Sequence, residues 1–288
     1  MPLAHVEHGK ASGDTALRMG LVGRGIALSR TPAMHEAEAA AQGLTCRYDL
    51  LDTDAGTEGS LAEIIDRAEA AGFAGLNITF PYKQTVIEHL HQLSDAARRI
   101  GAVNTIVFRD GQRFGHNTDF WGFSQSLRTG LPGADLSDVL LIGAGGAGGA
   151  LAHALADLGV GRLRILDVRE QAAATLAQEI GPVAEAVTDA AAVAGEVRGI
   201  VNATPVGMAK LPGTPIDTAL LDPQHWVADI IYFPLETAFL RAARTLGCQT
   251  LSGEGMAVFQ AVRAFELFIG RPADADRMRA TFRKLGAV

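Results

Sequence analysis

A short apolar stretch, Gly75-Leu-Asn77-Ile-Thr79-Phe-Pro81-Tyr-Lys83, ends in residues that can do chemistry. Asn77 offers an amide that both donates and accepts hydrogen bonds, and Thr79 offers a hydroxyl. Lysine occurs only at 10, 83, 210 and 284, so 25 − 4 = 21 of the basic residues are arginine. Chance alone could explain that rarity, but a lysine ammonium has a pKa that its surroundings can move, whereas arginine stays charged. We therefore interpret the stretch as a strand end that carries hydrogen-bonding groups and a candidate acid or base.

A second chemical feature is the sequence Gly143-Ala144-Gly145-Gly146-Ala147-Gly148, a G-x-G-x-x-G that follows the apolar run 139–142 and opens a helical pattern. The first glycine permits a tight turn, the second lets a pyrophosphate approach the backbone, and the third lets helix and strand pack closely. The helix N-terminus adds N–H groups that favour an anion. This context predicts a dinucleotide site rather than a glycine-rich turn without a ligand.

The cofactor preference depends on the end of the next predicted strand. Asp167 lies 167 − 143 = 24 residues after Gly143. A carboxylate there accepts hydrogen bonds from ribose hydroxyls and repels a 2′-phosphate, which predicts NAD. Arg169, two residues further on, leaves NADP possible. We expect NAD to be preferred.

A polar loop closes another predicted strand, where a cofactor could cross the carboxyl edge of the sheet. Taken alone, the loop could be an ordinary turn, but beside the glycine sequence we expect it to contact the cofactor. Its candidate contacts are Asn202, Thr204, Pro205, Gly207 and Met208.

The composition limits the possible functions. The 288 residues are 48% hydrophobic and 20% charged, enough for buried cores and typical of about two domains. The net charge of −7 argues against nucleic acid and anionic membranes as partners, and an anionic ligand would need positive groups placed locally. We expect a cytoplasmic protein for three reasons. The two cysteines are far apart in the sequence, the N-terminal stretch lacks the apolar core of a signal peptide, and no run approaches the ~18 apolar residues of a membrane span. The histidines show no metal-ligand spacing, so no metal is expected.

Strand-like and helix-like runs alternate along the chain, which predicts an α/β fold. We expect a mixed first sheet, because a turn at 109–112 joins two runs as a hairpin. The runs after residue 131 predict a doubly wound parallel sheet, and the stretch 255–288 is helical and should pack back on the first unit. The expected strands are 19–22, 47–51, 75–79, 104–108, 114–116, 139–142, 163–168, 199–203 and 226–231.

Five ordered segments resemble those of the shikimate dehydrogenase family, over residues 19 to 286. Within the family, the opening segment is most similar to NAD-preferring quinate/shikimate dehydrogenases. The segments are Gly23-Arg-Gly-Ile-Ala-Leu-Ser29-Arg-Thr31-Pro32-Ala-Met-His35, Asn77-Ile-Thr79-Phe-Pro81-Tyr-Lys83, Gly101-Ala-Val-Asn104-Thr105, Gly115-His-Asn117-Thr118-Asp119 and Gly253-Glu-Gly255-Met256-Ala-Val-Phe-Gln260.

The resemblance implies a substrate-binding catalytic domain over 1–122, joined by helices 255–288, and a Rossmann-type dinucleotide-binding domain over 123–254. It implies reversible hydride transfer between NAD(P) and the C3 oxygen-bearing carbon of shikimate, quinate or their dehydro forms. Lys83 is then the acid/base and Asp119 the carboxylate that orients it. The implied substrate contacts are Ser29 and Thr31 at the carboxylate, with Asn77, Thr79, Asn104, Gln260 and Tyr232; Gly253 and Met256 join the cofactor contacts.

The sequence departs from the commoner family pattern. Leu28 replaces a histidine, Thr31 replaces a second serine, and Asp167-Val-Arg169 replaces a phosphate clamp. These changes favour an NAD-linked enzyme that acts on both acids, since one methyl group shifts discrimination by only ~1–3 kcal/mol. The alternatives are a strict NADP-linked shikimate dehydrogenase of aromatic amino acid biosynthesis, an aminoshikimate dehydrogenase, and a non-catalytic NAD- or metabolite-binding regulator.

Structural roles are the competing interpretation for several residues. Lys83 could be a solvated loop lysine, and Asp119 could only stabilise a helix N-terminus. Trp121 and Phe123 are expected in the core, and His35 and His116 on a polar surface or in a supporting position. The protein is expected to be a monomer or homodimer.

Overall fold

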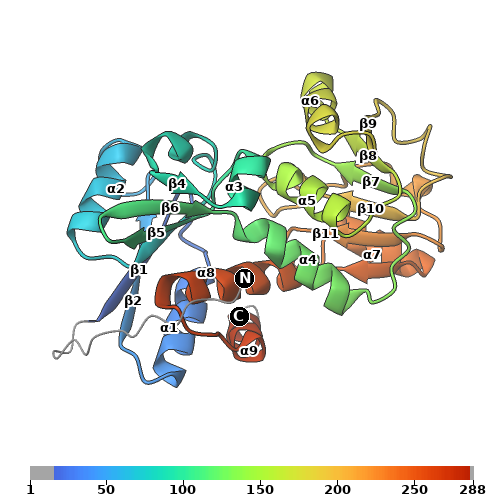
Figure 1. Ribbon diagram of the computed structural model, residues 1–288. Helices are drawn as coiled ribbons and strands as arrows, with labels where there is room; N and C mark the ends of the chain where they lie inside the picture. Colours follow the sequence, from blue (N-terminus) through green and yellow to red (C-terminus); the bar gives the residue numbers. More distant parts are fainter. Residues whose placement is uncertain (1–15, 286–288) are drawn as a thin grey trace.

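The computed structural model describes residues 16–285 as two lobes, each built around a six-stranded sheet (Figure 1). The first sheet has the order β2-β1-β3-β5-β6-β4 and is mixed, because β5 runs antiparallel to both β3 and β6. Its strands are β1 Leu17–Gly23, β2 Cys46–Asp52, β3 Gly75–Ile78, β4 Gln92–Leu93, β5 Thr105–Arg109 and β6 Gln112–His116. The helices of this lobe are α1 Thr31–Ala41, α2 Leu61–Ala70, η1 Thr85–His89 and α3 Asp95–Ile100.

The second sheet is parallel throughout and has the order β12-β11-β10-β7-β8-β9. Counted from β7, this is the 3-2-1-4-5-6 order of a dinucleotide-binding fold. The strands are β7 Val139–Ile142, β8 Leu163–Leu166, β9 Ala184–Ala186, β10 Gly199–Asn202, β11 Trp226–Asp229 and β12 Gln249–Leu251. The connecting helices are α5 Gly146–Asp157, α6 Glu170–Ile180, η2 Thr218–Leu220 and α7 Ala238–Leu246.

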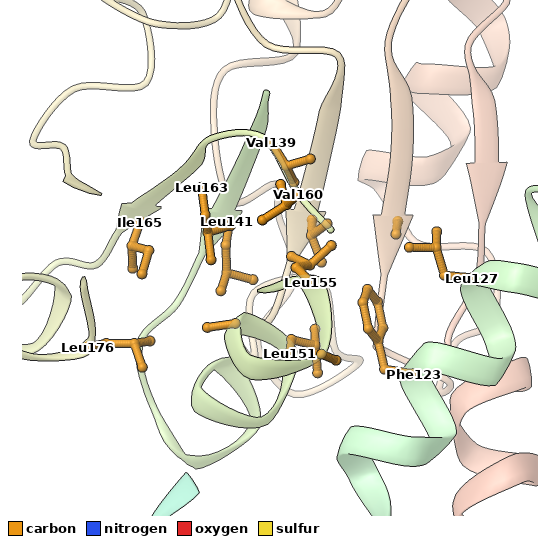
Figure 2. Packing of buried hydrophobic residues seen from close by; sticks show 14 of the residues in the cluster. Phe123, Leu127, Val139, Leu141, Leu151, Leu155, Val160, Leu163, Ile165 and Leu176 are labelled. Carbon is orange, nitrogen blue, oxygen red and sulfur yellow. The ribbon is translucent and has the colours of Figure 1, made fainter. Parts of the chain in front are cut away.

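The core of the second lobe follows from its continuous apolar strands. β7 reads Val-Leu-Leu-Ile and all four residues are buried, as expected for a parallel strand covered by helices on both faces. Figure 2 shows Val139 and Leu141 of β7 packed with Leu151 and Leu155 of α5. Phe123 of the helix that enters this lobe lies in the same cluster, which agrees with its predicted core position.

Two long helices join the lobes, α4 Thr118–Gly130 and α8 Glu254–Ile269 (Figure 1). They pack closely because glycines face the partner helix: a Cβ on Gly122 would lie 2.9 Å from the Met256 carbonyl, and one on Gly255 would lie 2.2 Å from Ser126 Oγ. The chain ends in α9 Ala275–Lys284, which packs with α8 against α1 in one buried cluster. The proposed boundaries at 122 and 254 stay a prediction.

The α/β class, with one mixed and one Rossmann-like sheet, is confirmed. The predicted strands are present within one or two residues, whereas β4, β9 and β12 were not predicted, because two or three residues show no periodicity. Within residues 16–285 no helix is both long and apolar enough to cross a membrane. The N-terminal stretch used for the localisation prediction, Lys10, and residues 286–288 lie outside the described residues.

Candidate active site

The centre of the site is an ion pair between Lys83 and Asp119. Lys83 follows β3, and its carbonyl accepts a 2.7 Å hydrogen bond from the Val103 N–H. Asp119 lies in the first turn of α4, which Asn117 caps by accepting from the Phe120 N–H. The Lys83 Nζ donates to Asp119 Oδ2 over 2.6 Å, and the two side chains are only 21% and 8% exposed. The structure therefore does not place Lys83 as a solvated loop lysine, and Asp119 holds it from a helix N-terminus.

Most hydrogen-bonding groups of the Asn104 side chain, just before β5, already have partners in neighbouring residues. Its Oδ1 accepts from the Thr118 N–H over 2.7 Å and from the Thr105 hydroxyl over 3.1 Å, and its Nδ2 donates to Thr118 Oγ1 over 3.0 Å. Because a primary amide carries two N–H donors, one Nδ2 hydrogen has no partner among the described residues. Asn104 can therefore only donate to a ligand, and its predicted substrate contact stays a proposal.

Asn77 is held more tightly, inside the protein. Its Oδ1 accepts from the Tyr48 hydroxyl over 2.7 Å, and its Nδ2 donates to Thr105 Oγ1 and to the Asn104 carbonyl over 3.0 and 3.4 Å. Both N–H donors are thus used, and the side chain is buried. In the structure, the Asn77 side chain stabilises the end of β3 through these hydrogen bonds. Its direct contact with substrate stays a prediction. Nothing in the local sequence distinguishes Tyr48, so its support of Asn77 was not predicted.

The opening loop carries the residues predicted to bind the substrate carboxylate. Asp52 holds it by accepting 2.9 Å hydrogen bonds from the N–H groups of Gly25 and Ile26. The Asp54 N–H donates to the same carboxylate and contributes most to lowering the pKa of Asp52. After this turn, Ser29 and Thr31 are partly exposed and start α1, with the Thr31 N–H 3.3 Å from Ser29 Oγ. Both hydroxyls are placed at a helix N-terminus that has no side-chain cap.

Three other predicted substrate residues lie on three separate segments of the chain. Tyr232 follows β11 in the second lobe and is still 41% exposed. Its pKa is raised, mainly because the surrounding protein disfavours the phenolate and further by Asp119, while the charges of Lys83 and Arg30 lower it. The phenol therefore lies within electrostatic reach of both ends of the site. Gln260 is half-buried on α8 and its Nε2 donates to the Ala257 carbonyl over 2.9 Å. Thr79 is half-buried at the end of β3.

The glycine loop has the geometry of a dinucleotide site. Gly143 has φ +104°, in the region that favours glycine, and a Cβ on Gly148 would lie 1.9 Å from the Gly143 carbonyl. By contrast, a Cβ on Gly145 or Gly146 would meet no atom within 4 Å, so the space above the loop is open. α5 begins here without a side-chain cap, which leaves N–H groups for an anion; Ala147 lies in its first turn, partly exposed.

Asp167 already has two partners in the structure. Its Oδ2 accepts from the Ala144 N–H over 2.7 Å and its Oδ1 from the Arg169 N–H over 2.9 Å. Burial would raise the pKa of Asp167, but these N–H groups and the Arg169 guanidinium outweigh it, so the pKa lies below its ordinary value. The carboxylate therefore links the glycine loop to the end of β8. Arg169 is 70% exposed, with Nε 3.5 Å from Asp167 Oδ1.

The second polar loop is braced from within. Asn202 is fully buried; its Nδ2 donates to the Val206 carbonyl and to Asp229, and its Oδ1 accepts from the Thr204 N–H and hydroxyl. These bonds shape the turn, so contact of the Asn202 side chain with a cofactor stays a prediction, as it does for the rest of the loop. Pro205 and Met208 are exposed, and Gly207 is buried with φ +113°.

Gly253 and Met256, at the start of α8, support the second lobe. A Cβ on Gly253 would lie 2.3 Å from the Ile230 carbonyl, so only glycine fits there. Met256 is 8% exposed and belongs to the core cluster beside Phe123 and Leu127. Their cofactor contacts remain predictions. Within residues 16–285 no cluster of three or more His, Cys, Asp or Glu side chains could hold a metal ion.

The structure excludes the polar-surface position, one of the two expected for His35. His35, expected on a polar surface or in a supporting position, is fully buried against Tyr48, Phe265 and Phe268, and both ring nitrogens lack a hydrogen-bond partner. It lies on the face of α1 that packs into the core, and burial lowers its pKa to about 3. His116 is partly buried, and its pKa is lowered to about 4, mainly by burial.

Comparison with known proteins agrees with this geometry. Family models described as "Shikimate dehydrogenase substrate binding domain" and "Shikimate 5'-dehydrogenase C-terminal domain" match residues 21–106 and 253–281. The chain is 48% identical over 283 residues to the "Quinate/shikimate dehydrogenase (NAD(+))" of Corynebacterium efficiens, covering 94% of this chain and 99% of the relative. It is 49% identical over 277 residues to the "Shikimate dehydrogenase (NADP(+))" of Streptomyces avermitilis, covering 93% and 95%. The structure of quinate dehydrogenase from Corynebacterium glutamicum in complex with NAD superposes with a TM-score of 0.90 at 45% identity, over 93% of this chain and 99% of that one.

Proposed function

The chain belongs to the shikimate dehydrogenase family, and from this premise we propose that it is a quinate/shikimate dehydrogenase that prefers NAD. Its general reaction class is that of an oxidoreductase that uses NAD or NADP and acts on a CH–OH group. The observation that carries the proposal is the 2.6 Å pair of Lys83 and Asp119, because a proton-transfer group held by a carboxylate suits the oxidation of an alcohol.

We assign substrate binding to the first lobe, residues 1–122 with the returning helices 255–288, and cofactor binding to residues 123–254. The open space above Gly145 and Gly146 and the uncapped start of α5 fit a pyrophosphate. When bound, the nicotinamide accepts a hydride from the ring carbon, or returns it.

Lys83 moves the proton that accompanies this hydride. In oxidation, the C3 hydroxyl loses its proton to a neutral Lys83 amine as the C–H electron pair leaves with the hydride. In reduction, the ammonium returns the proton to the ketone oxygen. Asp119 keeps the Lys83 Nζ pointed at that oxygen and accepts from a neighbouring ring hydroxyl. The remaining N–H of Asn104 donates to another ring oxygen, while Gln260 and Thr79 offer further polar groups.

The preference for NAD rests on Asp167. Its carboxylate lies at the end of β8, linked to the glycine loop through Ala144, where ribose hydroxyls are bound in such folds. A negative charge there repels the 2′-phosphate of NADP. Arg169, exposed beside it, is the observation that favours the second candidate, an NADP-linked shikimate dehydrogenase. A relative at 49% identity carries that name.

The test is a set of initial rates with quinate or shikimate and with NAD⁺ or NADP⁺, at alkaline pH where proton release favours oxidation. Turnover of both acids with NAD⁺ is the expected result. Turnover of shikimate alone with NADP⁺ would support the second candidate, and rates with an aminoshikimate test the remaining enzyme alternative. If no cyclitol acid is turned over, a non-catalytic metabolite-binding regulator replaces the enzyme proposal. The cytoplasmic location and the monomeric or dimeric state stay predictions.

A further inference from the structure

Arg30 is a buried cation in the opening loop that carries the predicted substrate contacts Ser29 and Thr31. It lies between Ser29 and Thr31 and is only 9% exposed. Its Nη1 donates to the Phe282 carbonyl over 3.2 Å, and its guanidinium carbon lies 4.5 Å from the centre of the Phe282 ring and 6.0 Å from that of Phe233. Buried arginines are usually paired with a carboxylate. Among residues 16–285, no carboxylate oxygen lies within 4.0 Å of Arg30.

The positive charge of Arg30 is not cancelled by a neighbouring carboxylate of residues 16–285, unlike that of Lys83. Lys83 and Asp119 neutralise each other, so they contribute little net charge to the cleft. Arg30 retains its positive charge while it is buried against the Phe282 ring, where water screens charge poorly. In a protein with a net charge of −7, this leaves a positive charge, unpaired within the described residues, on the loop that also carries Ser29 and Thr31.

Arg30 also links the two lobes. Phe282 belongs to α9, which packs on the first lobe, while Phe233 follows β11 of the second lobe, next to Tyr232. The Tyr232 ring lies edge-on to Phe282 with centroids 6.1 Å apart. A charge on Arg30 therefore acts where the tyrosine of the cofactor lobe meets the loop of the substrate lobe.

We propose that Arg30 is a specificity-determining residue, whose unpaired charge selects substrates that carry a carboxylate over neutral polyols of the same shape. The inference deepens the proposed function, on which it rests. Ser29 and Thr31 supply hydroxyl donors that can bind a neutral carboxamide as well as a carboxylate, with a preference for the anion that comes only from charge-assisted hydrogen bonds. The charge of Arg30 distinguishes the two, since a hydrogen-bonded or nearby charge changes binding far more than a neutral contact does.

The test compares shikimate with its neutral carboxamide in the wild type, Arg30→Gln and Arg30→Lys. For Arg30→Gln, KM for the acid should rise roughly tenfold to a hundredfold, with kcat within about threefold and KM for the carboxamide nearly unchanged. Arg30→Lys keeps the charge and should restore most of the preference for the acid. Arg18→Gln is the matched control, because Arg18 also lies over an aromatic ring, Phe73, at 4.3 Å, but pairs with Asp49.

Equal losses for acid and carboxamide, or a change in melting temperature without a change in their ratio, would overturn the inference and make Arg30 a structural link to α9. Wild-type turnover of shikimate tests the proposed function separately. If the wild type turns over neither compound, calorimetric binding of the acid and the carboxamide to the same three proteins still decides whether Arg30 selects for charge.

Discussion

Replacing His35 by leucine should remove much of the acid sensitivity of the fold. His35 is fully buried, both ring nitrogens lack partners, and its pKa is lowered from 6.5 to about 3 by burial. The folded state therefore keeps the ring neutral, whereas the unfolded chain takes up a proton below its ordinary pKa. The stability from the neutral ring is complete above pH 6.5 and is lost as the pH falls from 6.5 towards 3.

The size of the effect follows from the two pKa values. Each unit between them corresponds to about 1.4 kcal/mol, so lowering the pH from about 7 to about 5 should cost the wild type about 2 kcal/mol through His35. This is a substantial share of a typical stability of about 5–15 kcal/mol. Leucine has a similar volume, does not titrate, and buries no unpaired nitrogen, so the variant should be at least as stable at neutral pH.

The assay is the free energy of unfolding from urea titrations at several pH values. The curve for His35→Leu should be flatter than the wild-type curve by about 2 kcal/mol between pH ~7 and ~5. His116 titrates in both proteins, so its contribution cancels in the difference. Parallel curves for wild type and His35→Leu would refute the reasoning.

Three further changes test the site. Lys83→Ala should lower kcat by a factor of roughly 10²–10⁴, because the proton donor is lost. Substrate should still bind in calorimetry, because the other polar contacts remain. A near-normal rate would show that Lys83 takes no part in the proton transfer. Asp167→Ala should weaken NAD⁺ binding about tenfold and NADP⁺ binding less; unchanged NAD⁺ affinity would show that the carboxylate only holds the Ala144 N–H. Gly148→Ala should abolish cofactor binding measured by fluorescence titration, since its Cβ would lie 1.9 Å from the Gly143 carbonyl. Gly149→Ala, whose Cβ meets only an ordinary 3.9 Å contact, should bind normally, and equal behaviour of the two variants would contradict the loop geometry.

The sequence predicted the features that depend on local pattern. The glycine spacing predicted the turn at Gly143 and the helix after it, because positive φ and close helix packing demand glycine at particular positions. Alternating strand and helix periods predicted a mixed and a parallel sheet. The ordered segments that carry Lys83, Asn104 and Asp119 resembled one family, and that resemblance is confirmed by near-full-length relatives.

Tertiary structure decided the features that depend on residues distant in the sequence. Lys83 and Asp119 are 36 positions apart, and only the packing of β3 beside the start of α4 brings their charged atoms to 2.6 Å. His35 reads as a polar residue near a functional loop, yet its place on the inner face of α1 buries it. In the sequence, Arg30 only separates Ser29 from Thr31, yet in the fold it contacts Phe282 of α9, 252 residues later. Burial and electrostatic partnership are properties of three-dimensional neighbours, and for these residues the local sequence does not contain them.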